Sequence, residues 1–508
     1  MSLRDFDRRT FIADTARAYT ERRISKREFL RKMSLAGIGF SGFATTFLGG
    51  HRPFRGLTNL GTGMASAQTP DDVKNWLKEV GGQFSGTTIR FTSEATPPTI
   101  VANQIAKDEF TAATGINVEI EIVPLEQVLQ KATLDVQGQL GTYDLYYLDQ
   151  SWMATFAPDT IDPLEKYNSD KELAMPGFDW DDFSKPLVDG ISMYDGKMVG
   201  IPFDIPIFIL MYRKDLLDKH GISVPTTMDE YMAAVKAIDE AERGNGVFGT
   251  TGQLKSGHYS LNCDWTAWLW SHGGSIFGPD QMFAGGDAAG IEGLNYMLEL
   301  AEHMPPTAKT WTWDGEGQSV SQGTAGMLIS WGEFFPGFDG KDSKVVGLME
   351  AAHPPKEKAL RTPAEAGFGE IPHIGHQGGS ALALSAYSKN PDAAWIFMQW
   401  VCSPDVMARV STLGGGASPM RLSAFKDPRV LAAAKVGPGT TRHFPAIEWT
   451  INNAMGSEPD MPAWAEISNN VIPVELGKLL AGQYGSPEEC MEAIKTQTDE
   501  LAAPFRKA

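Results

Sequence analysis

The chain has 508 residues, of which 42% are hydrophobic and 21% charged, and a formal net charge of −19. This length is too great for a single hydrophobic core, and the composition excludes a disordered or collagen-like chain. The acidic balance argues against nucleic acid and anionic lipid as partners. The chain has three cysteines, which allow at most one disulfide and lack metal-site spacing. We expect them to be buried thiols: Cys263, Cys402 and Cys490.

The first 67 residues have the pattern of an export signal. A basic segment at residues 25–32 precedes an uncharged run at residues 33–50 that is rich in Gly, Ser, Ala and Phe. Ala65-Ser66-Ala67 then offers small residues to a signal peptidase. The run is poor as a membrane-spanning helix because of its glycines and serines. We therefore expect residues 1–67 to be removed on export to the periplasm.

The export route follows from the same segment. Residues 25–30 resemble a twin-arginine signal, with Lys26 in place of the first arginine. The mild hydrophobicity of the following run favours that route, and general secretion remains the alternative.

After the signal, five segments alternate between strand and helix. Alternating β-prone residues predict strands at residues 87–92, 116–123 and 143–148. Apolar residues at helical spacing predict helices at residues 99–113 and 125–140. This order indicates βαβ units and a largely parallel sheet. Ligands of such sheets bind beyond the carboxyl ends of the strands, where Asp149 and Trp152 follow the third strand and Glu94 the first.

Residues 200–222 organise the middle of the chain. A hairpin with Asp195-Gly196 at its turn leads into them. Residues 207–211 are apolar and predict a strand, and a helix that ends on Gly221 follows. Pro202 and Pro206 restrict the residues before them and suit a crossing between two lobes.

The remaining segments predict a second α/β unit and a return to the first. Thr227 caps a helix, three tryptophans lie within residues 258–274, and a buried strand at residues 327–331 ends on Trp331. Gly378 and Gly379 precede a further strand. Helices are predicted at residues 391–402, from residue 403 and at residues 486–501.

These segments resemble bacterial extracellular solute-binding proteins of the sugar-binding class, family 1. The motifs are GIPFDIPIFILMYRKDLLDKHGI at residues 200–222 and GGASPMR at residues 415–421, within a similarity over residues 85–505. The resemblance implies an α/β, two-lobed periplasmic-binding-protein fold (type II-like) with three hinge crossings. It implies a first lobe of residues 68–205 and 373–413, and a second lobe of residues 206–372 and 414–508.

The function implied by the resemblance is an extracytoplasmic receptor. Such a protein captures a carbohydrate or polyol in a cleft between its lobes and delivers it to the permease subunits of an ABC transporter. It acts as a monomer, without catalysis, cofactor or metal.

Stacking aromatic rings and polar groups that bind hydroxyls are the side chains a sugar requires. The resemblance implies that four tryptophans stack on the ligand: Trp152, Trp265, Trp331 and Trp464. Glu94, Asp149 and Asp204 would accept hydroxyl hydrogen bonds, Gly378-Gly379 would present backbone N–H groups, and Arg421 would donate from its planar fork. Each has a structural alternative: a tryptophan in the core, a helix cap at Asp149, or an inter-lobe salt bridge at Arg421.

Three other functions remain open at this stage, one of which is an exported scaffold that binds no small ligand. Paired acids such as Glu365 and Glu370, or Asp181 and Asp182, could belong to an exported glycoside-processing enzyme. Acids around aromatic rings could instead bind a non-sugar solute such as a polyamine. No nucleophile-elbow, zinc-protease or phosphate-loop motif is present, and we expect His373 and His376 to be ordinary loop histidines.

Overall fold

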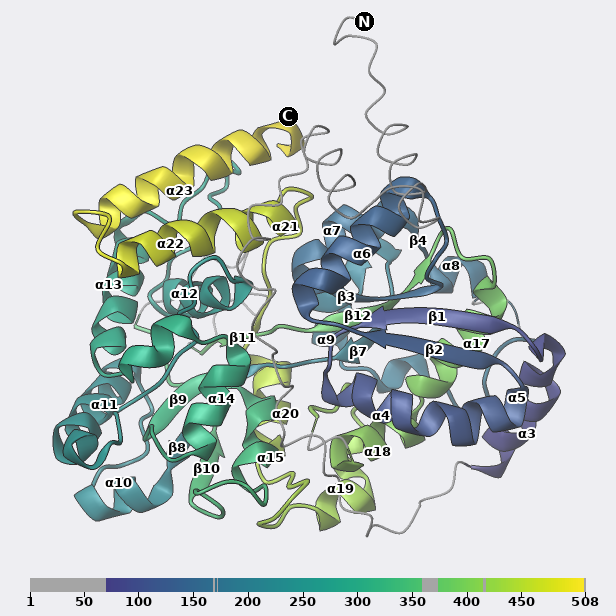
Figure 1. The fold of residues 1–508 in the computed structure, drawn as a ribbon, viewed down its shortest axis with the longest axis horizontal. Helices are drawn as coiled ribbons and strands as arrows, with labels where there is room; N and C mark the ends of the chain where they lie inside the picture. Colours follow the sequence, from purple (N-terminus) through teal and green to yellow (C-terminus); the bar gives the residue numbers. More distant parts are fainter. Residues whose placement is uncertain (1–69, 168–169, 171, 359–372, 414–416, 507–508) are drawn as a thin grey trace, which may run out of the picture.

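The structure is a computed structural model that describes residues 70–167, 170, 172–358, 373–413 and 417–506. The predicted export signal and its cleavage site lie outside this part of the chain, as do Glu365 and Glu370. Within the described ranges, no helix is both long and apolar enough to cross a membrane. Figure 1 shows two lobes side by side, the first largely in purple and blue with green segments, and the second largely in teal and green with yellow helices.

The first lobe is built on a six-stranded sheet. Its strands lie in the order β2-β1-β3-β12-β4, with β7 also paired to β12. Their bounds are β1 (Thr88–Ser93), β2 (Asn117–Ile122), β3 (Leu145–Asp149), β4 (Thr160–Ile161), β7 (Ile201–Asp204) and β12 (Ser380–Ser385). β1 is parallel to β2 and β3, as the βαβ pattern predicts, whereas β12 runs antiparallel to β3, β4 and β7. The carboxyl ends of β3 and β7 therefore meet the amino end of β12 at one edge of the sheet.

Helices surround this sheet (Figure 1). They are α3 (Asp71–Glu79), α4 (Pro97–Ile105), α5 (Ala112–Thr114), α6 (Leu125–Gly138), α7 (Met153–Phe156), α8 (Pro163–Tyr167), α9 (Lys185–Ile191), α17 (Pro391–Val401) and α18 (Pro404–Leu413). The single helix predicted at residues 99–113 is instead divided. A π-helical segment, η2 (Ala106–Thr111), separates α4 from α5, and Gly115 ends the run with a φ of 73°. A period-based pattern cannot detect this insertion, because the apolar positions continue through it.

The second lobe has a three-stranded antiparallel sheet in the order β10-β8-β9. These strands are β8 (Phe208–Arg213), β9 (Met327–Trp331) and β10 (Met349–Ala352). The helices are α10 (Lys214–His220), α11 (Met228–Glu242), α12 (Tyr259–Ser271), α13 (Ala288–Glu302), α14 (Trp313–Ser321), α15 (Phe335–Phe338), α22 (Ile472–Leu480) and α23 (Pro487–Ala502). The predicted cap of α11 is a complete capping box between Thr227 and Glu230. All residues of α12 are buried, which makes it the central helix of this lobe.

The predicted hinge segment has the expected local structure. Asp195 and Gly196 have positive φ angles of 49° and 78° at the turn between β5 (Met193–Tyr194) and β6 (Lys197–Met198). β7 then belongs to the first sheet and β8 to the second, so the chain changes sheets between Asp204 and Phe208. Gly221 caps α10 with a φ of 65°.

Two further segments run between the lobes and pair with each other. They are β11 (Gly375–His376) and β13 (Met455–Gly456), which are parallel. The chain between them has contacts in both lobes. η9 (Ala424–Lys426) and α19 (Pro428–Ala432) pack against α18, whereas Arg442 forms an ion pair with Asp339 and α20 (Phe444–Asn453) packs on β8 and β10. The predicted boundary at residues 413 and 414 thus remains a prediction.

All three cysteines are buried and free, as the sequence predicts. The largest fully buried side chains include five tryptophans: Trp152, Trp265, Trp270, Trp400 and Trp464. Much of the tryptophan content therefore stabilises the two cores.

Candidate functional site

Three predicted acids lie at the same edge of the first sheet. Asp149 ends β3 and Asp204 ends β7, and both are register partners of Ser380 on β12. Glu94 directly follows β1, the strand beside β3. This placement results from the topology, because the parallel strands end together and the antiparallel strand between two of them begins there.

Asp149 is held by the turn that follows it. Its Oδ1 accepts hydrogen bonds from the Ser151 backbone N–H at 2.9 Å and the Ser151 hydroxyl at 2.6 Å, which caps the short helix η3 (Gln150–Trp152). Burial raises the pKa of Asp149 to about 7, against the lowering effect of the two Ser151 hydrogen bonds. The helix-cap role named as an alternative is therefore present.

Asp204 faces an acid of the second lobe. Its Oδ2 accepts a hydrogen bond from the Tyr147 hydroxyl at 3.0 Å. Glu333, on η8 (Gly332–Phe334) after β9, lies beside it. Burial raises the pKa of both carboxyls, and the charge of Asp204 raises that of Glu333 further. This is the behaviour of two carboxyls that share one proton. Glu94, Asp204 and Glu333 are called the acid cluster below.

Glu94 completes the acid cluster. Burial raises its pKa well above the usual value, and the charges that raise it further all belong to acids: Glu126, Asp314, Asp204 and Asp149. Asp314 lies on α14 of the second lobe, and Glu126 on α6 of the first. The acid cluster is thus surrounded by negative charge from both lobes.

One ion pair joins the lobes beside the acid cluster. Nε2 of His258, the N-cap residue of α12, lies 2.6 Å from Oε1 of Glu126. Despite the opposing effect of burial, His258 lowers the pKa of Glu126 to about 2. The Glu126 side chain is 43% exposed, so solvent weakens this pair. It exists only when α6 and α12 are close, and it therefore favours the closed arrangement of the lobes.

We expect His258→Gln to open the unliganded protein. Loss of a partly exposed pair should destabilise closure by about 0.5–1 kcal/mol, which is roughly a two- to fivefold change in the open-to-closed ratio. Small-angle X-ray scattering should then report a larger radius of gyration. The matched control is His220→Gln, which removes a histidine–glutamate pair that lies within the second lobe. Equal radii for the two variants would show that the His258 pair does not hold the lobes together.

Trp331 lies where the second lobe meets the hinge glycines. Its ring packs edge-on against Phe208 at 4.3 Å between centroids, and its Nε1 donates to Oε1 of Gln253 at 3.1 Å. Gln253 in turn donates from Nε2 to Oδ1 of Asp264 at 2.9 Å. A Cβ at Gly378 would lie 2.8 Å from the Trp331 ring, so only glycine fits here. Because residue 378 has no side chain, the segment that leads into β12 of the first lobe can contact the Trp331 indole.

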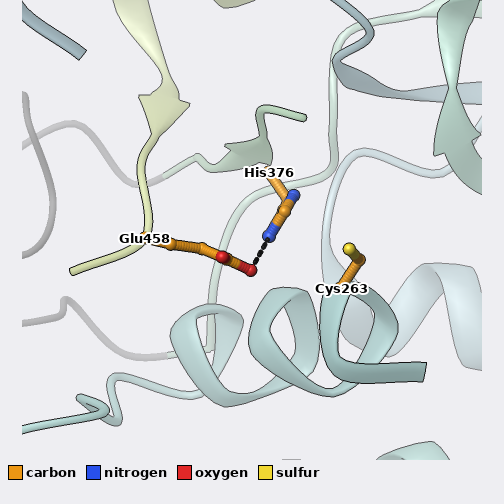
Figure 2. Close-up of side chains that lie close together, drawn as sticks. All are labelled: Cys263, His376 and Glu458. Atoms are coloured by element: carbon orange, nitrogen blue, oxygen red, sulfur yellow. Dashed lines mark hydrogen bonds and ion pairs between the residues drawn. The ribbon is translucent and has the colours of Figure 1, made fainter. Parts of the chain in front are cut away.

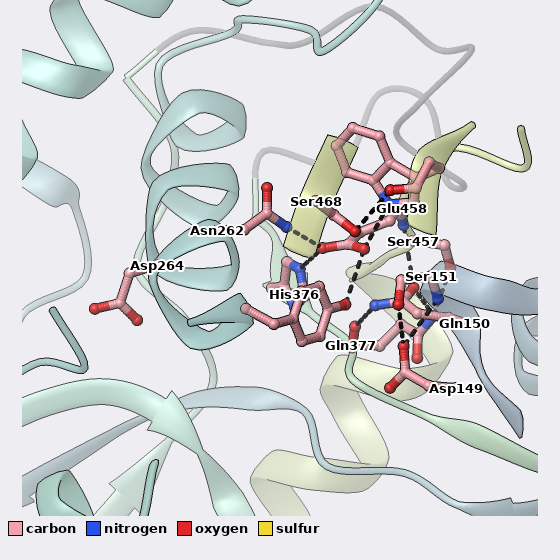
Figure 3. Close-up of polar contacts among 12 residues, drawn as sticks. Asp149, Gln150, Ser151, Asn262, Asp264, His376, Gln377, Ser457, Glu458 and Ser468 are labelled. Atoms are coloured by element: carbon pink, nitrogen blue, oxygen red, sulfur yellow. Dashed lines mark hydrogen bonds and ion pairs between the residues drawn. The ribbon is translucent and has the colours of Figure 1, made fainter. Parts of the chain in front are cut away.

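A second polar network surrounds Glu458, which lies two residues after β13 (Figure 3). Oε1 of Glu458 accepts from Asn262 at 2.7 Å and pairs with His376 at 3.1 Å. Oε2 accepts from the Tyr259 hydroxyl at 2.8 Å and from Nε1 of Trp464 at 2.7 Å. The indole N–H of Trp464 is therefore used within the protein, and the side chain is fully buried.

This network also reaches the first lobe through Gln150. Its Oε1 accepts from the Glu458 backbone N–H at 3.1 Å, and its side chain bonds with that of Gln377 (Figure 3). Gly379 also links these two glutamines. Its backbone N–H donates to the Gln377 side chain, and its carbonyl accepts from the Gln150 backbone N–H. The segments that contain Gln150, Gln377 and Glu458 are thus joined by hydrogen bonds beside β11 and β13.

Cys263, His376 and Glu458 come close enough to resemble a metal site (Figure 2). Their candidate ligand atoms lie within 4.8 Å of one another, and all three residues are buried. However, the Glu458 carboxylate already has four hydrogen-bond partners, and burial raises the pKa of the Cys263 thiol well above its usual value. These four hydrogen-bond donors satisfy the oxygens of the buried Glu458 carboxylate, so its burial does not require a metal ion. His376 is therefore a buried network residue, whereas the sequence predicts a loop histidine.

The other predicted residues pack inside a lobe. Trp265 is fully buried and stacks on Phe283, with 6.2 Å between the ring centroids. Trp152 is also buried, at 1% exposure. Arg421 is fully buried in contact with Phe183, and its Nε donates to the Cys402 carbonyl at 2.7 Å. All three side chains are buried in this arrangement of the lobes, so none of them is exposed to a solute.

Several residues of the site carry no detectable signal in the sequence. Glu333 is two residues past the buried strand that ends on Trp331, and Glu126 and His258 each stand at a helix start. Acids and histidines at such positions are commonly caps or solvated groups. Only the tertiary arrangement brings them together from separate segments.

The sequence model described as a bacterial extracellular solute-binding protein matches residues 95–408. The chain belongs to this family. Solute-binding proteins of this family serve ABC importers outside the cytoplasm, and the relatives and solved structures that resemble this chain are binding proteins rather than enzymes. The two-lobed fold expected from the resemblance is confirmed by the solved structures of such proteins.

Three relatives illustrate the range of this solute-binding family. A probable amino-acid ABC transporter periplasmic-binding protein of Sinorhizobium fredii is 25% identical over 75% of this chain and 83% of its own. The erythritol/L-threitol-binding protein of Mycolicibacterium smegmatis is 22% identical over 78% and 83%, respectively. A solute-binding protein of Agrobacterium radiobacter K84 in complex with ribitol has a TM-score of 0.72 and 25% identity, covering 82% of this chain and 99% of that chain.

Proposed function

We propose that this solute-binding protein captures a carbohydrate or polyol between its lobes and delivers it to an ABC permease. The proposal is carried by the composition of the lobe interface. There the carboxyls of the acid cluster, which can accept hydrogen bonds, lie near the indole of Trp331 and the backbone of Gly378. Carboxyl groups bind hydroxyls and an indole face stacks on C–H surfaces. The ribitol complex and the erythritol/L-threitol-binding relative support this ligand class.

The ligand acts by stabilising the closed state. A solute bound between Asp204 of the first lobe and Glu333 or Trp331 of the second contacts both lobes only when they are closed. It shifts the equilibrium by its difference in affinity for the two states. The closed protein then docks on the permease as a monomer, in the periplasm after export, with no nucleic acid involved. No bond of the solute is made or broken.

The proposal is tested by a thermal-shift screen of the full-length chain against sugars and polyols, including ribitol, mannitol and maltose. A ligand at 100 times its Kd should stabilise the protein by about 2.7 kcal/mol. Trp331→Ala should abolish this shift while leaving a cooperative unliganded transition. Trp180→Ala, which removes an indole packed on Phe178 in the first lobe, should keep the shift.

One outcome would remove Trp331 from the binding site, and another would contradict the proposed function. A shift in Trp331→Ala equal to that of the parent would make Trp331 purely structural. Cleavage products after incubation with oligosaccharides would instead identify a glycoside-processing enzyme. The product assay is therefore run on every ligand that gives a shift.

A further inference from the structure

The indole of Trp331 has a hydrogen bond that six other buried tryptophans lack. Among the described residues, these six have an indole N–H without a hydrogen-bond partner: Trp76, Trp152, Trp265, Trp268, Trp270 and Trp400. Packing alone is therefore sufficient to bury a tryptophan in this protein. Nε1 of Trp331 instead donates to Oε1 of Gln253 at 3.1 Å, and Gln253 is fully buried. Because burial does not require this bond, what it adds is a fixed orientation of the ring.

The position of Trp331 in the second sheet explains why its ring needs such a bond. β9 is an edge strand, and Trp331 ends it, so Phe208 on β8 is its cross-strand neighbour. The second angle of a tryptophan side chain has two broadly favoured values, about half a turn apart. A half-turn about the Cβ–Cγ bond would carry Nε1 away from Gln253. The hydrogen bond thus selects one of the two ring orientations.

Gln253 is itself held by Asp264, a buried residue of α12. Its Nε2 donates to Oδ1 of Asp264 at 2.9 Å, and its backbone N–H donates to Oδ2 at 3.2 Å. A Cβ at Gly252 would lie 3.1 Å from the same Oδ2, so a glycine lets this segment approach the carboxyl closely. Figure 3 shows that Asp264 and Asn262 point to opposite sides of α12, so Asp264 is separate from the network that contains Asn262.

The two neighbours of the Gln253 amide require the same orientation of it. An indole N–H can only donate, so the amide oxygen must face Trp331. Both oxygens of Asp264 accept from Gln253, so the amide nitrogen must face Asp264. The orientation of the Trp331 ring is therefore determined by residues that lie behind it, away from Gly378.

We propose that Gln253, held by Asp264, is a positioning residue that orients the Trp331 ring for stacking on the solute. The inference rests on the proposed function, because it concerns the same ring at the same lobe interface. Stacking requires the ring to lie along the C–H face of a sugar or polyol. A ring that is already held in this orientation loses less conformational freedom when the solute binds. Affinity then depends on Gln253 and Asp264, although neither touches the solute.

The first test is the substitution Gln253→Leu in the full-length chain, titrated by calorimetry with ribitol, mannitol and maltose. We expect affinity for each solute that the parent binds to fall about three- to tenfold, which corresponds to one lost hydrogen bond. The matched control is Gln399→Leu, in the first lobe. Gln399 is also buried, accepts from the Met175 backbone N–H at 2.8 Å and donates to the Leu173 carbonyl at 2.9 Å.

Gln399→Leu should lower Tm by an amount similar to that of Gln253→Leu and leave affinity unchanged. Parental affinity in Gln253→Leu would overturn the inference, as would an equal loss of affinity in both variants. Asp264→Asn makes the same test with a smaller change in the core, since it keeps one acceptor oxygen for the Gln253 amide. Its affinity should lie between those of the parent and Gln253→Leu.

A double-mutant cycle separates positioning from a general effect on the lobe. Trp331→Phe keeps an aromatic ring but has no N–H to be held. In this background Gln253→Leu should change affinity by less than about twofold, because the two side chains no longer interact. If Gln253→Leu instead costs as much in the Trp331→Phe background as alone, Gln253 does not act through Trp331 and the inference is wrong.

The indole N–H signals in NMR spectra of the ligand-free protein test the orientation without any solute. The Trp331 signal is identified by its loss in Trp331→Phe. In Gln253→Leu it should move upfield and exchange faster with water, whereas the signal of Trp464, which is bonded to Glu458, should stay in place. An unchanged Trp331 signal would overturn the inference and leave the sugar or polyol receptor intact. Failure of every solute to bind the parent would contradict the proposed function itself, and the stacking role with it, even where the Trp331 signal moves.

Discussion

Glu458→Ala should be among the most destabilising single substitutions in this protein. The change leaves His376, Asn262, Tyr259 and Trp464 without their shared acceptor in a fully buried site. Unsatisfied buried donors and the lost carboxylate together should cost about 3–5 kcal/mol. Thermal unfolding followed by circular dichroism should show a Tm lowered by several degrees, without any ligand present.

Two comparison variants make the interpretation specific. Glu466→Ala removes an exposed carboxylate that accepts one hydrogen bond, from Asn470, and should change Tm little. Glu458→Gln keeps one acceptor oxygen and should fall between the two. If Glu458→Ala melts like Glu466→Ala, the donors have found other partners and the network is not a major source of stability. If a chelator instead lowers the Tm of the parent protein, Cys263, His376 and Glu458 bind a metal ion after all.

The same network joins the chain segments that cross between the lobes. Gln150 follows β3, Gln377 precedes β12, and Glu458 follows β13. Their hydrogen bonds join residues separated by more than two hundred positions in the sequence. Because these hydrogen bonds link the segment after β3 to the segments before β12 and after β13, they help to position the acids at the ends of β3 and β7. The stability of the network and the geometry of the lobe interface are therefore linked.

The elements that the sequence predicts well are those with a strong period or a terminal signal. β2 and β8 follow from alternation and from an apolar run, and the capping box of α11 follows from Thr227 and Glu230. Asp149 and Glu94, the acids that end β3 and follow β1, are predicted by a topological rule that needs only the strand order. In each case the information lies within a short segment.

The remainder of the site cannot be predicted from any short segment, because it depends on contacts between residues that are far apart in the sequence. Glu126 and His258 are far apart in sequence, and neither has a pattern that indicates an ion pair between lobes. Glu333 becomes significant only because Asp204 lies beside it. Tryptophans are equally ambiguous, since core and ligand platform require the same large apolar ring. Trp265 is fully buried and Trp331 nearly so, but only Trp331 lies against the hinge glycine.

Arg421 provides the sharpest test between ligand binding and structure. The guanidinium is fully buried over the rings of Phe183 and Phe178, at 4.0 and 4.7 Å from their centroids. Its Nη1 donates to the Asp179 carbonyl at 2.8 Å, and Nε to the Cys402 carbonyl. We expect Arg421→Ala to destabilise the protein by about 2–4 kcal/mol, through two orphaned carbonyls and a cavity.

Sugar or polyol affinity should nevertheless remain that of the parent in Arg421→Ala, measured by calorimetry below its unfolding transition. Arg421→Lys should recover only part of the lost stability, since an ammonium cannot reproduce the planar fork that spans the Cys402 and Asp179 carbonyls. The control Arg90→Ala removes an exposed arginine paired with Glu119 and should change neither quantity. A loss of affinity in Arg421→Ala at unchanged Tm would place the guanidinium at the ligand, and would require the lobe interface to rearrange around residue 421 when the solute binds.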